Sequence, residues 1–121
     1  GPLGSGTSGS KTAIPDSFTA KDFRWTADLP GRGTSSPVLW GTKLFLTAEA
    51  DGDGQRQVLC YDATSGKRLW LYVDAFAAHG QHKFNNFASS TPACDEKHVY
   101  VAWTSGEQMH VLALDHSGKL V

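Results

Sequence analysis

The sequence predicts an all-β protein built of antiparallel sheets, and three observations carry that prediction. Eight short runs are rich in β-branched and aromatic residues, as strands are. Short glycine-containing turns separate most of these runs, and connections this short join antiparallel neighbours. No long stretch carries apolar residues at helical spacing, and residues 74–88 are too rich in Gly, Asn and His for a helix, so we expect a loop there.

The expected strands differ in how apolar they are. In chain order they are 23–27, 36–40, 43–47, 57–61, 68–73, 90–94, 98–103 and 109–114. Residues 69–73 and 111–114 are almost continuously apolar, whereas a strand with one face in water alternates. Antiparallel hairpin sheets covered on both faces are typical of stacked β-propeller blades, while the sheets of a sandwich usually leave one face wet.

An internal repeat supports this interpretation. Residues 35–38 match residues 90–93 at an offset of 55, and at the same offset residues 44–46 fall on 99–101. The hairpin that follows is two residues shorter in the second copy, after which 59–62 falls on 112–115 and 65–67 on 117–119. Each copy therefore predicts three strands, an Asp, a tight Ser-Gly turn and the start of a fourth strand, which together make one blade.

The turn of each copy has its own chemistry. Asp62 and Asp115 stand where a side-chain acceptor can hold backbone N–H groups of the turn. Gly66 and Gly118 supply the positive φ that such turns often require. We expect these four residues to form equivalent blade turns.

The residues 61–70, Tyr-Asp-Ala-Thr-Ser-Gly-Lys-Arg-Leu-Trp, resemble the repeat of the pyrroloquinoline-quinone-like (PQQ-like, quinoprotein-type) β-propellers. Residues 29–38 and 85–92 are similar to the first blades of bacterial quinoprotein-like repeat proteins. The resemblance implies that the tryptophan of an outer strand docks onto the neighbouring blade, a role that falls on Trp70 and Trp25.

We also expect a domain organisation. Residues 1–10 look like an expression tag and a flexible linker, and we expect 11–21 to be a lead-in. The resemblance implies that 22–75 are an outer strand plus the first blade and that 76–121 are a connecting loop plus a second blade lacking its own outer strand. About four to eight blades close a propeller, so two blades form an incomplete ring unless they oligomerise. We expect the missing blades of a parent protein or a head-to-tail homo-oligomer, in which residues 22–29 of one copy complete the second blade of the next.

Composition argues against two classes of partner. The 11 Lys and Arg residues are scattered and are balanced by 12 Asp and Glu, which is not the basic footprint of a nucleic-acid binder. The sequence holds no run of 18 apolar residues, so we expect no membrane span.

Two residues of the long loop are the candidates for ligand contact. His82 and Asn85 lie between the two inner-strand motifs, which in the family resembled is near the central channel. The alternative is that both only hydrogen-bond the loop to itself. The five histidines show no zinc spacing, so no metal site is expected among them.

Other polar features have simpler interpretations. The acidic hairpin 49–54 lacks the terminal glutamate of a calcium loop, because the twelfth position is Cys60, and we expect a solvated hairpin tip. Cys60 and Cys94 stand at inequivalent strand positions and are expected to be buried free thiols, although a bridge between them stays open.

The functional expectation follows from the lack of a convergent catalytic group. We expect a non-enzymatic propeller segment that binds or scaffolds, with no catalytic residue, cofactor or metal. The alternative is a fragment of a PQQ-dependent dehydrogenase whose active site lies in absent blades, and a third reading is a fragment cut to study propeller assembly. A periplasmic or secreted location is suggested by the resemblance alone.

Overall fold

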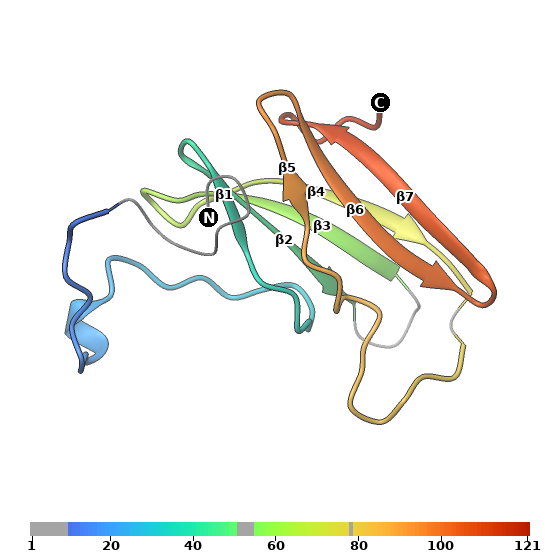
Figure 1. Cartoon of the computed structure of the whole chain (residues 1–121), viewed down its shortest axis with the longest axis horizontal. Helices are drawn as coiled ribbons and strands as arrows, with labels where there is room; N and C mark the ends of the chain where they lie inside the picture. Colours follow the sequence, from blue (N-terminus) through green and yellow to red (C-terminus); the bar gives the residue numbers. More distant parts are fainter. Residues whose placement is uncertain (1–9, 51–54, 78) are drawn as a thin grey trace.

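The computed structural model describes residues 10–50, 55–77 and 79–121, and this part of the chain folds into two antiparallel β-sheets (Figure 1). The first sheet has the order β1-β2-β3-β4 and the second the order β5-β6-β7. The strands are β1 Val38–Trp40, β2 Lys43–Glu49, β3 Gln55–Asp62, β4 Arg68–Ala75, β5 Ala93–Cys94, β6 His98–Ser105 and β7 Gln108–Asp115. The all-β prediction is confirmed.

Helical structure within the described ranges is limited to a 3-10 turn, η2, over Ala20–Asp22. Thr19 begins this turn, since its backbone N–H and hydroxyl both donate to the Asp22 carboxylate at 2.7 and 3.0 Å. The turn lies to one side of the sheets in the blue part of Figure 1. In the described residues, no helix has the length and apolar character needed to cross a membrane.

Seven of the eight expected strands form, and one does not. Residues 23–27 were expected to be a strand, but they form none and have no ladder partner in the described structure. A strand needs a neighbouring strand to satisfy its backbone groups, and this segment is held mainly through the Trp25 side chain. The expected strand at 90–94 shortens to β5, and the loop expected over 74–88 begins after Ala75, the last residue of β4.

The core lies between the two sheets. Residues paired across neighbouring strands share a face, so Phe45, Cys60 and Trp70 line one face of the first sheet. Val99 and Val101 lie opposite Leu114 and Leu112 in the second sheet. These residues pack together in one buried cluster, which is completed by Val58 and Trp103. The sheets therefore stack face to face.

One charged side chain crosses this interface. Arg56 of β3 is only 1% exposed, and its Nη1 donates to the Thr104 carbonyl of β6 at 2.9 Å. Its Nη2 donates to the Asp74 carboxylate of β4 at 3.2 Å. The guanidinium also lies over the rings of Phe76 and Trp103, at 4.0 and 4.8 Å from their centroids. The buried charge is thereby compensated within the fold.

Candidate functional site

The seam between the sheets is closed by Trp70. Its indole Nε1 on β4 donates to the carbonyl of His116 at 3.1 Å, in the turn that follows β7. The same ring lies against Gly118, where an added Cβ would stand 2.7 Å from the indole Cδ2. A large aromatic ring is thus anchored on the other sheet by one hydrogen bond and one close backbone approach.

Trp25 makes the same pair of contacts one sheet earlier. Its Nε1 donates to the Ala63 carbonyl at 2.9 Å, and a Cβ on Gly66 would stand 2.6 Å from its Cδ2. Further along, Arg32 pairs with Glu49 at the end of β2 through backbone hydrogen bonds in both directions. The segment from Trp25 to Arg32 is therefore attached at both ends of the first sheet.

The two turns that receive these indoles are built alike. Asp62 accepts from the backbone N–H groups of Thr64 and Ser65 at 2.9 and 2.8 Å. Asp115 accepts from the N–H groups of Ser117 and Lys119 at 2.8 and 3.0 Å. Hydrogen bonds to the charged form lower the pKa of both carboxyls, mainly from Ser65 for Asp62 and from the Ser117 side chain for Asp115, whose pKa falls to about 2.

The glycines of these turns have left-handed backbones. Gly66 has φ of 73° and Gly118 has φ of 88°. Each is the second residue of a Ser-Gly pair and contacts a tryptophan ring as well. Backbone conformation and close packing therefore both favour glycine here.

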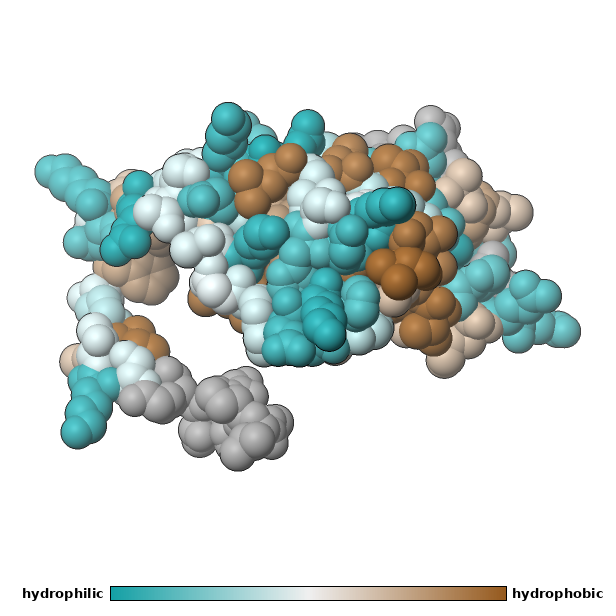
Figure 2. Space-filling view, turned by 90° about the horizontal axis from the view of Figure 1, so that it is seen from above, coloured by the Kyte–Doolittle hydropathy of each residue, from teal (hydrophilic) through white to brown (hydrophobic). Residues whose placement is uncertain are grey.

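The outward faces of the stacked sheets expose apolar side chains. On β7, Met109 and Val111 are 72% and 65% exposed. On β4, alternate residues point away from the core and are at least one-third exposed: Leu69, Leu71 and Val73. Seen from above in Figure 2, brown apolar patches are interspersed with hydrophilic surface. The middle of the first sheet's outward face is covered, since Ala48, Leu59 and Tyr61 form a second buried cluster.

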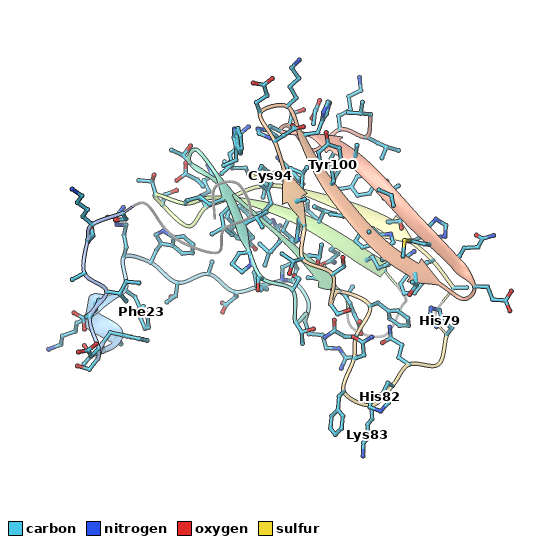
Figure 3. All side chains as sticks on the ribbon, in the orientation of Figure 1. Phe23, His79, His82, Lys83, Cys94 and Tyr100 are labelled. Carbon is cyan, nitrogen blue, oxygen red and sulfur yellow. The ribbon has the colours of Figure 1, made fainter. Side chains whose placement is uncertain are left out.

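The structure separates the two loop residues expected to contact a ligand. Asn85 lines a small pocket between the loop and the second sheet, whereas His82 does not. His82 and its neighbour Lys83 lie at the far tip of the loop in Figure 3. The His82 carbonyl accepts from the backbone N–H of Asn85 at 2.8 Å, which is the expected bonding of the loop to itself.

Glu49 has a different role from the solvated acid expected in the hairpin 49–54. It is 6% exposed, and its carboxylate accepts from Arg32 Nη2 at 2.9 Å and from the backbone N–H of Phe87 at 2.5 Å. Residues 51–54 lie outside the described residues. The period-2 pattern of β2 offered no signal for this buried acid, because its partners come from two distant loops.

A polar cluster near the β5–β6 turn was not anticipated. The Asp95 carboxylate accepts from the N–H groups of Lys97 and His98, both at 2.8 Å, and from the Tyr100 hydroxyl at 2.8 Å. These bonds lower the pKa of Asp95 to about 2, and the bond to Asp95 raises the pKa of the Tyr100 hydroxyl. Tyr100 lies on the second sheet in Figure 3. The signal in the sequence is an Asp before a tight turn, as at Asp62 and Asp115.

The two cysteines are free thiols at different depths. Cys60 is fully buried in the core, and burial raises the pKa of its thiol to about 11. Cys94 on β5 is only half-buried, so the expectation of burial is wrong in part for that residue. Within residues 10–50, 55–77 and 79–121, no three His, Cys, Asp or Glu side chains gather closely enough to hold a metal ion.

No protein-family model matches the chain, and no curated protein matches it.

Proposed function

We propose that this chain is a non-enzymatic binding and scaffolding module of the β-propeller type, in which the two sheets are successive PQQ-like blades. Its partner is a second copy of the chain, which stacks head to tail on the open face of the second sheet. The observation that carries the proposal is that the same pair of tryptophan–turn contacts occurs twice. In both places an indole N–H donates to the carbonyl that follows the turn Asp, and the ring covers the turn glycine.

The faces of the sheets support the same arrangement. By the internal repeat, Val99, Val101 and Leu114 of the second sheet correspond to Leu44, Leu46 and Tyr61 of the first. These second-sheet residues face the first sheet, whereas their first-sheet counterparts belong to its outward face. The sheets are therefore stacked head to tail, with different faces in contact, and such heterologous contacts can be continued by another copy.

The open face of the second sheet repeats the face that is buried in the first. Val111 and Ala113 correspond to Val58 and Cys60, which are fully buried between the sheets. Val111 itself is 65% exposed. Burying an apolar surface of this kind is favourable by about 25 cal/mol per Å², and a second copy offers the apolar residues of β4 to cover it.

Light scattering after size exclusion over a range of protein concentrations tests the proposal. We expect the wild-type mass to rise with concentration and Val111→Lys to remain monomeric with an unchanged circular-dichroism spectrum. Phe84→Lys is the matched control, because Phe84 is also apolar and, at 81%, even more exposed than Val111, but lies in the loop outside both faces. A wild-type chain that stays monomeric at high concentration, or a Phe84→Lys variant that dissociates like Val111→Lys, would overturn self-association.

A further inference from the structure

A pocket lies where the long loop passes the ends of β6 and β7. Its volume is about 210 Å³. The loop contributes Gln81, Asn85 and Ser89 among other residues, and the strands contribute Trp103, Thr104 and Met109. The pocket is smaller than the roughly 300–1,000 Å³ of sites for drug-sized ligands, so it suits a single small ring or group.

The lining has a definite chemical character. It contains carboxamides, hydroxyls and two aromatic rings, and none of its residues carries a formal charge. A charged ligand would lose its hydration without gaining a counter-charge from these residues. Carboxamides and hydroxyls both donate and accept hydrogen bonds, which matches a ligand whose groups also do both.

The wall of the pocket is fixed by contacts behind it. The Asn86 side chain donates to Thr34 Oγ1 at 3.3 Å and accepts from the Ala88 N–H at 2.9 Å. Phe87 is held through its N–H by Glu49. These bonds hold the loop in place before any ligand arrives, which reduces the entropy lost on binding.

Hydrogen-bonding groups at the pocket are left unused by the protein. The side-chain amides of Gln81 and Asn85 have no partner in the described part of the chain, and both residues are exposed. Trp103 is 5% exposed, and its indole Nε1 is buried with no hydrogen-bond partner among the described residues. The exposed amides of Gln81 and Asn85 are therefore available to hydrogen-bond a polar ligand in the pocket.

The neighbouring strand edge limits what can enter. β6 pairs with β7 along its whole length, but on its other side it pairs with β5 only at Val99 and Tyr100. The chain's own residues 89–92 lead into β5 along this edge, and Ser89 lines the pocket. An added peptide strand would have to displace these residues to pair with this edge of β6.

We propose that this pocket binds one neutral sugar ring, such as an uncharged hexose unit of a glycan. The hydroxyls of the ring hydrogen-bond to the amides of Gln81 and Asn85, and its C–H face packs on the Phe87 and Met109 side chains. The inference rests on the pocket and not on self-association. Thr104 and Met109 of the lining also lie on the open face of the second sheet, so a sugar and a stacked copy would compete for this edge.

Nuclear magnetic resonance of the isotope-labelled chain tests the site with defined probes. The chain is titrated with D-glucose, D-galactose, D-mannose and N-acetyl-D-glucosamine, with glycerol and a neutral Gly-Ser-Asn-Ser peptide as comparisons. We expect saturable shifts of the Gln81, Asn85 and Trp103 side-chain N–H signals with at least one sugar and not with glycerol. The absence of shifts with all four sugars, equal shifts with glycerol, or binding of the peptide alone would overturn the proposal.

Variants assign the contact to particular side chains. Asn85→Ala and Gln81→Ala each remove a hydrogen-bonding amide, so each is expected to weaken sugar binding about fivefold, the effect of roughly one net hydrogen bond. His82→Ala is the matched control, because His82 belongs to the same loop but does not line the pocket. Unchanged affinity in Asn85→Ala and Gln81→Ala, or an equal loss in His82→Ala, would contradict the site.

Discussion

The indole of Trp70 lies directly on Gly118, so that a Cβ at Gly118 would stand 2.7 Å from the Cδ2 of the ring. Real Cβ atoms do not approach another side chain this closely, and the ring cannot retreat without losing its hydrogen bond to His116. Trp25 and Gly66 stand in the same relationship. Each glycine therefore allows an indole ring to pack closely on the backbone, in addition to adopting the turn conformation.

Alanine at these glycines is expected to loosen the seam. Gly118→Ala and Gly66→Ala should each lower the free energy of unfolding by about 2–3 kcal/mol, because the strain of a positive φ is added to the overlap with the ring. Urea unfolding followed by tryptophan fluorescence measures this effect.

Two other glycines serve as matched controls, because alanine there would incur the strain of a positive φ without the overlap with a ring. Gly41 and Gly106 have φ of 58° and 59°, but a Cβ there would meet nothing within 4 Å. Gly41→Ala and Gly106→Ala should therefore cost only about 1 kcal/mol. Equal losses of unfolding free energy at all four glycines would contradict the close packing of the indole rings on Gly66 and Gly118.

Arg56 is expected to stabilise the stacking of the two sheets. Arg56→Met leaves the Thr104 carbonyl and the Asp74 carboxylate without this partner, and should cost about 2–3 kcal/mol in urea unfolding. Arg68→Met on β4 is the control, since Arg68 is exposed and makes no ion pair in the described structure. If Arg56→Met loses no more unfolding free energy than Arg68→Met, Arg56 does not hold the sheets together.

Glu49 is expected to stabilise the loop that carries the pocket. Glu49→Ala removes the acceptor of the Phe87 N–H and should cost about 2 kcal/mol, with faster hydrogen exchange at Phe87. Arg32→Ala should cost less than about 1 kcal/mol, because the Arg32 side chain is 70% exposed. Unchanged hydrogen exchange at Phe87 in Glu49→Ala would contradict this role of Glu49.

The hydrogen-bonded aspartates Asp95 and Asp115 are expected to make the fold less stable in acid. The pKa values of Asp95 and Asp115 are about 2 in the folded chain, below the ordinary value of 3.8, because the charged forms accept hydrogen bonds. Their contribution to the free energy of unfolding is present when the pH is above the pKa of the unfolded chain, and it is lost as the pH falls from about 4 towards 2.

A pair of variants tests this pH dependence. Asp115→Asn should reduce the drop in urea midpoint between about pH 5 and about pH 2.5, because the side chain can no longer titrate. Asp16→Asn is the control, as Asp16 lies in the N-terminal segment outside both sheets. An unchanged pH profile in Asp115→Asn would argue against the hydrogen-bonded turn.

Local patterns predicted much of this fold. Runs of β-branched and aromatic residues and the turns between them located seven strands, because a hairpin strand is defined by its own residues and its adjacent turn. They failed at residues 23–27, where strand propensity is present but no partner strand is available within the described structure. A strand is a property of a pair, which the composition of one segment does not reveal.

The site was less predictable for the same reason. The repeat located the turn residues, such as Asp62 and Asp115, because their hydrogen bonds stay within four residues. It did not reveal Glu49 or Arg56, whose buried charges are matched by residues 17 to 48 positions away. Asn85 was selected with His82 by position alone, and only the packing of the loop on β6 separates them.

A mixing experiment tests head-to-tail association most directly. Val111→Lys blocks the open face of the second sheet, and Leu71→Lys places a charge on the opposite outward face, where Leu71 is 37% exposed. Each variant alone is expected to be monomeric by sedimentation equilibrium, and their mixture should form a one-to-one heterodimer through the single intact seam. Mixed variants that remain monomeric, while the wild-type chain self-associates, would contradict the heterologous contact between the two faces.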